Sequence, residues 1–129
     1  MRNDYTDNIE ACPIGRVQKI IRGKWTMVII YYLSESHVLR FSELKRKMPQ
    51  VTEANLTKEL RTLEAYGIIH REIYREVPPR VEYSLTAVGT KFVPVLEALE
   101  TWALEYEAAK NYDAKSLEMD LTRRVGTMI

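Results

Sequence analysis

The middle of the chain carries the stretch Glu76-Val77-Pro78-Pro79-Arg80-Val81-Glu82-Tyr83, which lies between two short runs that are typical of β-strands. Residues 68–74 are rich in β-branched and aromatic side chains, and residues 81–85 alternate apolar with polar ones. Both prolines fall in the connection, where no ladder hydrogen bond is lost and where their fixed φ stiffens the chain. The pattern therefore predicts a β-hairpin whose rigid tip carries Arg80. A hairpin of this kind either grips a nucleic-acid backbone or is an ordinary surface feature.

A helix is predicted shortly before this hairpin. Its apolar stripe consists of Phe41, Leu44 and Met48. Ser42 is its expected N-terminal cap. Pro49 ends it, because the residue before a proline is displaced from the helical region. A short turn then leads into a second helix, so the pair is predicted to form a helix-turn-helix.

The second of these helices, predicted over residues 52–66, has two different faces. Thr52 is its expected cap and Gly67 its stop. Its buried stripe consists of Leu56, Leu60 and Leu63. The remaining surface carries side chains that can read base edges or bond phosphates, namely Asn55, Thr57, Lys58 and Arg61. The alternative is that these charges only solvate an exposed face beside Glu59 and Glu64, but the hairpin that follows favours nucleic-acid binding.

The segments before the helix-turn-helix are predicted to be mostly helical. Apolar residues recur at helical spacing after Pro13, which suits a first helical turn, and Gly23 ends that helix. A second helix over residues 25–33 is apolar on nearly all sides, so we expect it at the centre of the core. Residues 34–37 are predicted to form a polar turn, and residues 38–40 a short edge strand.

After the hairpin, Thr86 is expected to cap a long helix that Pro94 kinks near residues 90–93. The apolar positions of this helix exceed what a compact three-helix core needs. We hypothesise that it pairs with a second copy of the chain, together with the first helix, in a two-fold dimer. The residues expected at that interface are Ile14, Val17, Leu96, Leu99, Trp102 and Tyr106. The alternative is that the helix covers its own domain.

Length and composition indicate a single domain with a proper core, since 46% of the 129 residues are hydrophobic. No apolar run approaches the ~18 residues of a membrane span, and the first residues lack the apolar segment of a secretory signal. We therefore expect a cytoplasmic protein with no membrane partner. A single cysteine excludes an internal disulfide framework and a cysteine-based zinc site within one chain.

The net charge of +1 conceals an uneven distribution. Residues 40–91 hold ten Lys or Arg and seven Asp or Glu, a net +3, whereas residues 92–129 hold four and seven, a net −3. Residues 1–39 hold five and four, a net +1. The basic excess thus surrounds the hairpin, which favours a nucleic-acid-binding centre beside a segment that serves another purpose.

Several short strings in one order make the pattern specific: Cys12-Pro13, Gly23-Lys24-Trp25, Arg40-Phe41-Ser42-Glu43-Leu44, Leu56-Thr57-Lys58-Glu59-Leu60, Leu63–Ile69, Glu76–Thr86 and Gly89. Over about residues 11–106 the chain resembles the HxlR-type winged helix-turn-helix transcriptional regulators, which are relatives of the MarR group. The string over residues 76–86 is the most specific part. The chain departs from the family pattern at Arg22, where a glycine is expected, and at Ala87, where proline is usual. Neither departure is expected on the DNA surface.

The resemblance implies an α+β fold, a winged helix-turn-helix with flanking N- and C-terminal dimerisation helices. It divides the chain into a flexible arm (residues 1–10), the domain (11–109) and a tail that is loose or forms a short helix (110–129). It also implies a homodimer without a cofactor on near-palindromic double-stranded DNA, with the helix 52–66 in the major groove and the wing 75–82 on the backbone or minor groove. The residues expected to meet DNA are Arg40, Ser42, Lys45, Arg46, Thr52, Asn55, Thr57, Lys58, Arg61, Arg75 and Arg80.

Cys12 precedes a helix start, where a thiolate is stabilised and more reactive. In the resembled family some members sense oxidants or electrophiles through a cysteine at this position, so Cys12 is a candidate redox sensor. A disulfide would have to join it to Cys12 of another subunit or to a small thiol. The alternative is a half-buried structural cysteine at a dimer interface.

Other functions find less support in the sequence. No Gly-rich phosphate loop, nucleophile elbow or metal-ligand cluster is present, so we expect neither an enzyme nor a metal site, and His37 and His70 are expected to be solvated or packed. A winged-helix interaction scaffold without DNA binding is the main alternative, although such scaffolds tend to lose basic groove residues such as Lys58 and Arg61. A small-molecule effector could bind among the aromatic residues between core and dimer helices, but ordinary packing explains those residues as well.

Overall fold

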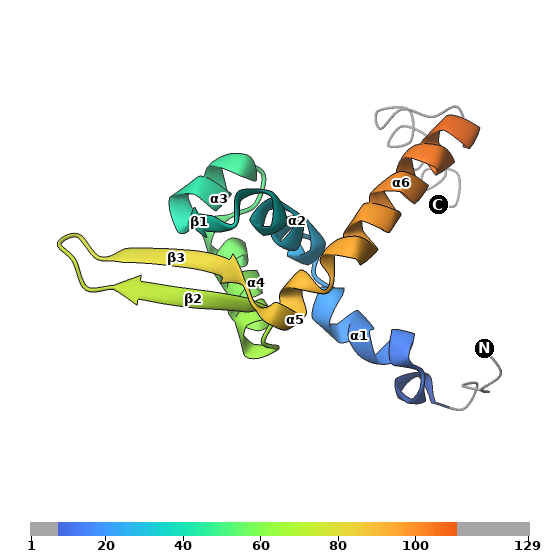
Figure 1. Ribbon diagram of the computed structural model, residues 1–129, viewed down its shortest axis with the longest axis horizontal. Coiled ribbons are helices and arrows are strands. Elements are labelled where there is room, and N and C mark those ends of the chain that lie inside the picture. The colour runs from blue at the N-terminus through green and yellow to red at the C-terminus, as the bar shows by residue number, and fades with distance from the viewer. Residues whose placement is uncertain (1–7, 111–129) are drawn as a thin grey trace, which may run out of the picture. The chain divides into compact units, whose positions relative to one another are not determined.

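The computed structural model describes residues 8–110 (Figure 1). Residues 1–7 of the predicted arm and residues 111–129 of the predicted tail lie outside the described residues. The chain divides into one unit that ends at Val93 and a second that begins at Pro94, and each is described by itself. The elements up to the division are the 3-10 helix η1 (Ile9–Ala11), α1 (Pro13–Ile21), α2 (Thr26–Ser36), β1 (Val38–Arg40), α3 (Phe41–Lys47), α4 (Glu53–Ala65), β2 (Ile69–Tyr74), β3 (Arg80–Leu85) and α5 (Ala87–Thr90).

The predicted helix-turn-helix is confirmed as α3 and α4. Thr52 caps α4, since its side-chain oxygen accepts a hydrogen bond from the N–H of Asn55 at 3.1 Å. Gly67 follows the helix with a φ of 74°, a conformation that glycine adopts without strain. The stripe that faces the core is at most 1% exposed and consists of Leu56, Leu60 and Leu63.

The start of α3 differs from the prediction. The helix begins at Phe41, so Ser42 lies within its first turn and the N-cap is Arg40. The N–H of Arg40 donates to the Oε1 of Glu43 at 2.8 Å, because the glutamate side chain reaches back to the helix start. The prediction of Ser42 as the cap is therefore wrong, whereas Pro49 does follow the helix end as expected.

The three strands form one antiparallel sheet in the order β1-β3-β2. The predicted edge strand over residues 38–40 is confirmed, and Leu39 lies opposite Tyr83 of the central strand. Strands β2 and β3 form a long hairpin that extends away from the helices of this unit (Figure 1). Tyr74 pairs with Arg80, so the connection consists of residues 75–79 and contains a cis Val77–Pro78 peptide bond. The predicted α+β class with a wing is confirmed.

Helix α2 lies at the centre of the core, as predicted. No side chain from Thr26 to Ser34 is exposed, and the most buried residues are Ile29, Ile30 and Leu33. The predicted polar turn over residues 34–37 is wrong, because α2 continues to Ser36 and only His37 leaves it, with a φ of 64°. The hydroxyl of Ser34 donates to the carbonyl oxygen of Tyr31 at 2.6 Å, so this polar residue is satisfied inside the helix.

Helix α1 begins at Pro13 and ends at Ile21 with Arg22 as its C-cap, so Gly23 directly follows the helix end, as predicted. The preceding helix η1 includes two residues that the sequence assigned to the flexible arm. The side chain of Asn8 caps η1 by accepting the N–H of Glu10 at 2.9 Å.

The segment after the hairpin forms two helices where the sequence predicted a single kinked one. Thr86 caps α5 as predicted, since its Oγ1 accepts the N–H of Gly89 at 3.1 Å. A separate helix α6 (Val93–Lys110) then begins, and Pro94 lies in its first turn, where the missing N–H leaves no bond unmade. Within α6 the rings of Trp102 and Tyr106 stack with centroids 5.3 Å apart.

Candidate nucleic-acid interface

The outward face of α4 carries the side chains that were predicted to read DNA. Asn55, Lys58 and Arg61 are exposed, and Thr57 is half-buried on one flank. Among the described residues neither Lys58 nor Arg61 forms an ion pair. The core side of the helix is therefore a leucine stripe, and the opposite side is polar and carries unpaired positive charge.

A second group of the predicted residues lies on α3. A shallow hollow of about 470 Å³ is lined by Ser42, Lys45 and Arg46 of α3 and by Glu53 at the start of α4. The Nζ of Lys45 donates to the carbonyl oxygen of Pro49 at 3.2 Å, whereas Arg46 is exposed. The last turn of α3 thus holds cations where the helix dipole favours them, close to the start of α4.

Arg80 does not lie at the hairpin tip, as the sequence predicted, but is the first residue of β3. Its Nη2 lies 3.4 Å from Oε1 of Glu76, and its Nε lies 3.5 Å from Oε2 of Glu82. Its guanidinium carbon is 4.1 Å from the centroid of the Tyr74 ring, which is the strand partner of Arg80. The prediction that Arg80 lies at the tip is therefore wrong, because the strand register places it at the start of β3, opposite Tyr74.

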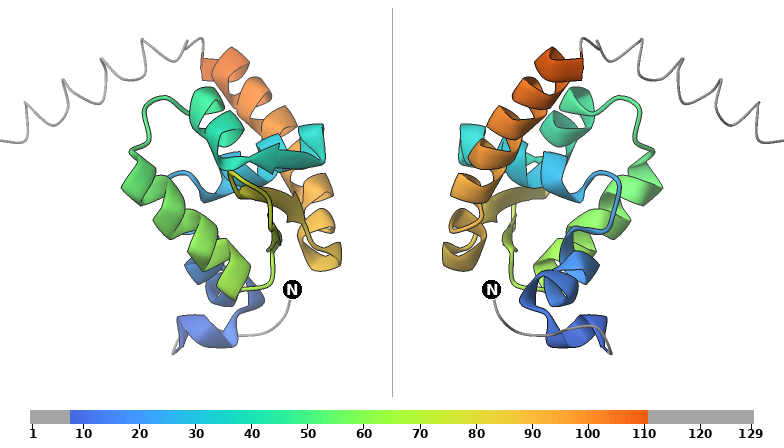
Figure 2. Two further views of the ribbon diagram at one scale, coloured as in Figure 1. Left: turned by 90° about the vertical axis from the view of Figure 1, so that its left-hand side faces the viewer. Right: turned by 90° about the vertical axis from the view of Figure 1, so that its right-hand side faces the viewer.

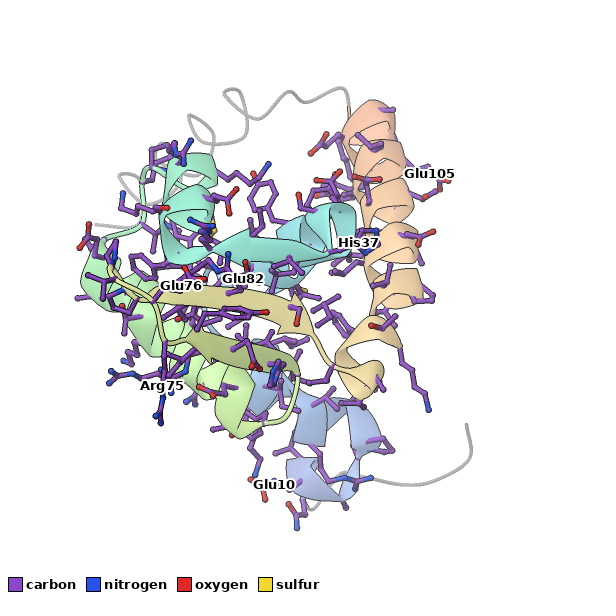
Figure 3. All side chains as sticks on the ribbon, turned by 60° about the vertical axis from the view of Figure 1, so that its left-hand side comes forward. Glu10, His37, Arg75, Glu76, Glu82 and Glu105 are labelled. Atoms are coloured by element: carbon purple, nitrogen blue, oxygen red, sulfur yellow. The ribbon has the colours of Figure 1, made fainter. Side chains whose placement is uncertain are left out.

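Arg75 is the free arginine of the hairpin. It follows β2 directly, is exposed, and has no ion-pair partner among residues 8–110. Its side chain projects away from the ribbon, whereas Glu76 and Glu82 lie along the hairpin (Figure 3). The wing therefore combines one arginine that is paired internally with one that is available to a partner.

The sequence analysis missed one contact of α4, on the flank that faces the connection between α1 and α2. The carboxylate of Glu59 accepts the N–H of Trp25 at 3.1 Å and 3.5 Å through its two oxygens. Burial raises the pKa of Glu59 above its ordinary value, against the lowering effects of this hydrogen bond and of Lys58. The contact joins residues 34 positions apart in the sequence, so no local pattern could reveal it.

The one local signal for this contact is Gly23. A Cβ at this position would lie 2.8 Å from Oε1 of Glu59, so a larger residue here would displace the glutamate side chain. The adjacent Arg22 lines the same flank as Asn55 and Lys58, which are predicted to meet DNA. Arg22 thus lies beside residues that are expected on the DNA surface, although the family resemblance led us to expect it elsewhere.

The residues predicted for dimerisation and sensing fall on α1 and α6. Cys12 is the N-cap of α1 and is half-buried. Ile14 and Val17 are 61% and 41% exposed on the same helix. In the single chain Leu96 of α6 is buried, whereas the exposed apolar residues of that helix include Leu99, Trp102 and Tyr106.

The two histidines have ordinary surroundings. The Nε2 of His70 lies 2.7 Å from Oε2 of Glu72 on the same exposed strand, and His37 ends α2. Within residues 8–110, no group of three or more His, Cys, Asp or Glu side chains could hold a metal ion. In the same range, no helix combines the length and apolar character that crossing a bilayer requires.

Comparison with known proteins gives a consistent result. Residues 20–111 match the family described as HxlR-like helix-turn-helix. The HTH-type transcriptional regulator YdeP of Bacillus subtilis (strain 168), itself uncharacterized, is 42% identical over 105 residues, which are 81% of this chain and 81% of YdeP.

Solved structures of similar fold are also regulators. A protein described as a MarR-family transcriptional regulator, from Porphyromonas gingivalis W83, matches with a TM-score of 0.70 and 41% identity, over 74% of this chain and 93% of that chain. The redox regulator HypR in its reduced form matches with a TM-score of 0.72 and 37% identity, over 78% of this chain and 100% of that chain. These relatives are transcriptional regulators and not enzymes.

Proposed function

Because this chain belongs to the HxlR-like helix-turn-helix family and is an HTH-type transcriptional regulator, we propose that it binds specific double-stranded DNA as a homodimer. In this proposal α4 enters the major groove, and its groove-facing residues, which contact base edges or the phosphates beside them, are Asn55, Thr57, Lys58 and Arg61. The residues that contact the neighbouring backbone are Arg40, Ser42, Lys45, Arg46 and Thr52.

The observation that carries the proposal is the contrast between the two faces of α4. Three leucines hold the helix rigidly against the core, while Lys58 and Arg61 point outward and have no ion-pair partner among the described residues. An exposed cation without an ion-pair partner stays available for phosphate oxygens or for the acceptors of guanine. A helix that only solvated its surface would gain from pairing these charges along its own length.

The wing is proposed to contact the backbone or the minor groove beside this helix. Arg75 is the proposed direct contact, since its charge is free. Arg80 stays in the proposed contact set, but it would have to leave Glu76 or Glu82 to bond a phosphate. Its main proposed task is to hold the hairpin straight through the stack on Tyr74.

The homodimer is proposed to form through α1 and α6. Both helices carry exposed apolar side chains, which include Ile14, Val17, Leu99, Trp102 and Tyr106. A two-fold dimer would place its two α4 helices about one turn of DNA (~34 Å) apart on a near-palindromic site. Sedimentation at micromolar concentration should show a dimer, and a monomer there would contradict this part of the proposal.

Cys12 is proposed to make DNA binding sensitive to oxidants or electrophiles. HypR, a relative of similar fold, is described as a redox regulator and has been solved in oxidised and reduced forms. In this chain the thiol would form a disulfide with Cys12 of the second subunit or with a small thiol, because the full sequence has one cysteine. Cys12→Ser should then keep DNA binding and lose its response to diamide, and a variant released from DNA as readily as the wild type would exclude this role.

The central test is the selection of bound sequences from random duplex DNA, repeated with an electrophile present. We expect a near-palindromic consensus. Affinity for the selected site should fall steeply with salt, with a slope of roughly −0.9 per phosphate neutralised. No enrichment, or an affinity that hardly changes with salt, would contradict DNA binding and favour a winged helix that acts as a protein-interaction scaffold.

A further inference from the structure

A hollow of about 380 Å³ lies between one flank of α4 and the connection that joins α1 to α2. Lys19, Arg22 and Lys24 line it from the side of α1 and the connection. Asn55 and Lys58 line it from α4, with Glu59 at its base. Four cationic side chains thus converge beside two of the residues that are proposed to read DNA.

The connection is held on α4 by one hydrogen bond and is fixed internally by another. The N–H of Trp25 donates to the Glu59 carboxylate at 3.1 Å, and the hydroxyl of Thr26 donates to the carbonyl oxygen of Gly23 at 2.9 Å. Thr26 is 2% exposed, which fixes the start of α2 at this place. Arg22 and Lys24 are therefore carried on a short backbone segment of defined position, although their side chains reach into solvent.

The charges in the hollow are largely uncompensated. Lys19 pairs with Glu10 at 3.2 Å, but among the described residues Arg22, Lys24 and Lys58 have no ion-pair partner. The Nζ of Lys24 lies 5.2 Å from the centroid of the Trp25 ring, a contact that leaves its charge in place. The single carboxylate of the hollow, Glu59, already accepts the Trp25 N–H.

The hollow and the wing lie on different flanks of α4. Glu59 holds the α1–α2 connection, whereas Glu64 pairs with Arg71 of β2 at 3.3 Å. Five residues apart on an α-helix, these two glutamates point about 140° from each other around the axis. The connection accordingly runs along α4 on the side away from the hairpin (Figure 2).

We propose that Arg22, Lys24 and Lys58 form a second clamp on the DNA backbone, opposite the wing. This inference rests on the proposed function, in which α4 lies in the major groove. That groove is bounded by a phosphate strand on each side, so a helix inside it has one strand at each flank. The wing would meet one strand, and the hollow would receive phosphates of the other. The cations of the hollow are exposed, so each one alone would bind a small free anion weakly. A DNA strand would bind more tightly, because its binding also releases counterions.

The test uses the full chain and its selected DNA site, with affinity measured by fluorescence anisotropy across a range of salt concentrations. Arg22→Gln and Lys24→Gln should each make the salt slope shallower by roughly 0.9, the value for one phosphate. Lys91→Gln is the matched control, because Lys91 is an exposed lysine that does not line the hollow, and its slope should equal that of the wild type. Thermal melting should show that all three variants fold.

A second kind of variant should raise the affinity for DNA instead of lowering it. Glu59→Gln keeps an oxygen for the Trp25 N–H and removes the only carboxylate of the hollow, so it should bind the same DNA more tightly. Replacing single phosphates of the site by neutral methylphosphonates should weaken the wild type at the clamped positions. The Arg22→Gln and Lys24→Gln variants should be insensitive to the same replacements.

The outcomes separate this inference from the function on which it rests. If Arg75→Gln makes the slope shallower but neither hollow variant does, the wing binds DNA and the second clamp is refuted. If the hollow variants lose binding of inorganic phosphate while their DNA slope stays unchanged, the hollow is a small-anion site and the clamp is refuted as well. If the wild type binds no duplex from the selection, DNA binding itself fails and the inference fails with it.

Discussion

Helix α4 and the β2–β3 hairpin are both rich in charged residues, but they use those charges differently. On α4, Lys58 and Arg61 have no ion-pair partner among the described residues, and they lie opposite a leucine stripe that fixes the helix. In the hairpin, Arg80 is held by Glu76, Glu82 and the Tyr74 ring, and Arg75 alone is free. Free cations on a rigid helix suit the reading of base edges. Paired charges stiffen the hairpin, which is proposed to contact the DNA backbone. Each experiment below perturbs one side of this contrast.

The largest effect is expected on the core side of α4. Leu60 is 1% exposed, so Leu60→Ala should lower the free energy of unfolding by about 2–5 kcal/mol through lost burial and the cavity left behind. Urea denaturation measures this loss. Arg61→Ala, on the outward side, is the control and should stay within about 0.5 kcal/mol of the wild type. Equal losses for the two variants would mean that the two faces of the helix are not distinct.

The next effect concerns base preference. Arg61→Ala or Asn55→Ala should reduce discrimination at one base position of the selected site by ~1–3 kcal/mol, if the contact that is lost is bidentate. The measurement compares binding to the selected site with binding to single-base variants of that site. A loss of affinity that is the same for every sequence would place these two residues on the backbone instead.

A smaller and uniform effect is expected from the wing. Arg75→Gln should weaken binding about equally across DNA sequences and make the salt slope shallower by roughly 0.9. Arg80→Ala should also weaken all sequences alike, because it loosens the hairpin as well as removing a charge. Should Arg80→Ala bind like the wild type, the arginine and the prolines beside it stiffen the hairpin for a purpose other than DNA binding.

The smallest effect is expected at Glu59, which joins α4 to the α1–α2 connection. Burial raises the pKa of its carboxyl above the ordinary 4.5, so the folded protein holds this proton more tightly than the unfolded chain does. Its contribution to stability is therefore present at low pH and declines as the pH rises through the raised pKa. Glu59→Gln should gain stability relative to the wild type between pH 4.5 and neutrality, measured as the urea midpoint at each pH. The opposite trend would show that the Trp25 N–H and the cations Arg22, Lys24 and Lys58 outweigh burial.

Much of the scaffold could be predicted from local patterns. The cap at Thr52, the stop at Gly67 and the leucine stripe between them placed α4 to within one residue at each end, because each signal depends on neighbours within one or two turns. The helix after Thr86 was harder to predict. Pro94 was expected to kink a continuous helix, but it lies in the first turn of a new one, and proline is compatible with both arrangements.

In the candidate site, too, local patterns predicted some features and the packing of the elements decided the others. The sequence by itself determined which side of α4 faces outward and which of its residues are cationic, since helical periodicity fixes both. Only the tertiary structure decided that Arg80 is held inside the hairpin and that Arg22 and Lys24 lie beside Asn55 and Lys58. These arrangements depend on strand register and on the bond between Trp25 and Glu59, which joins separate elements. Contacts of that kind are set by how the elements pack, and a pattern read along the chain does not contain them.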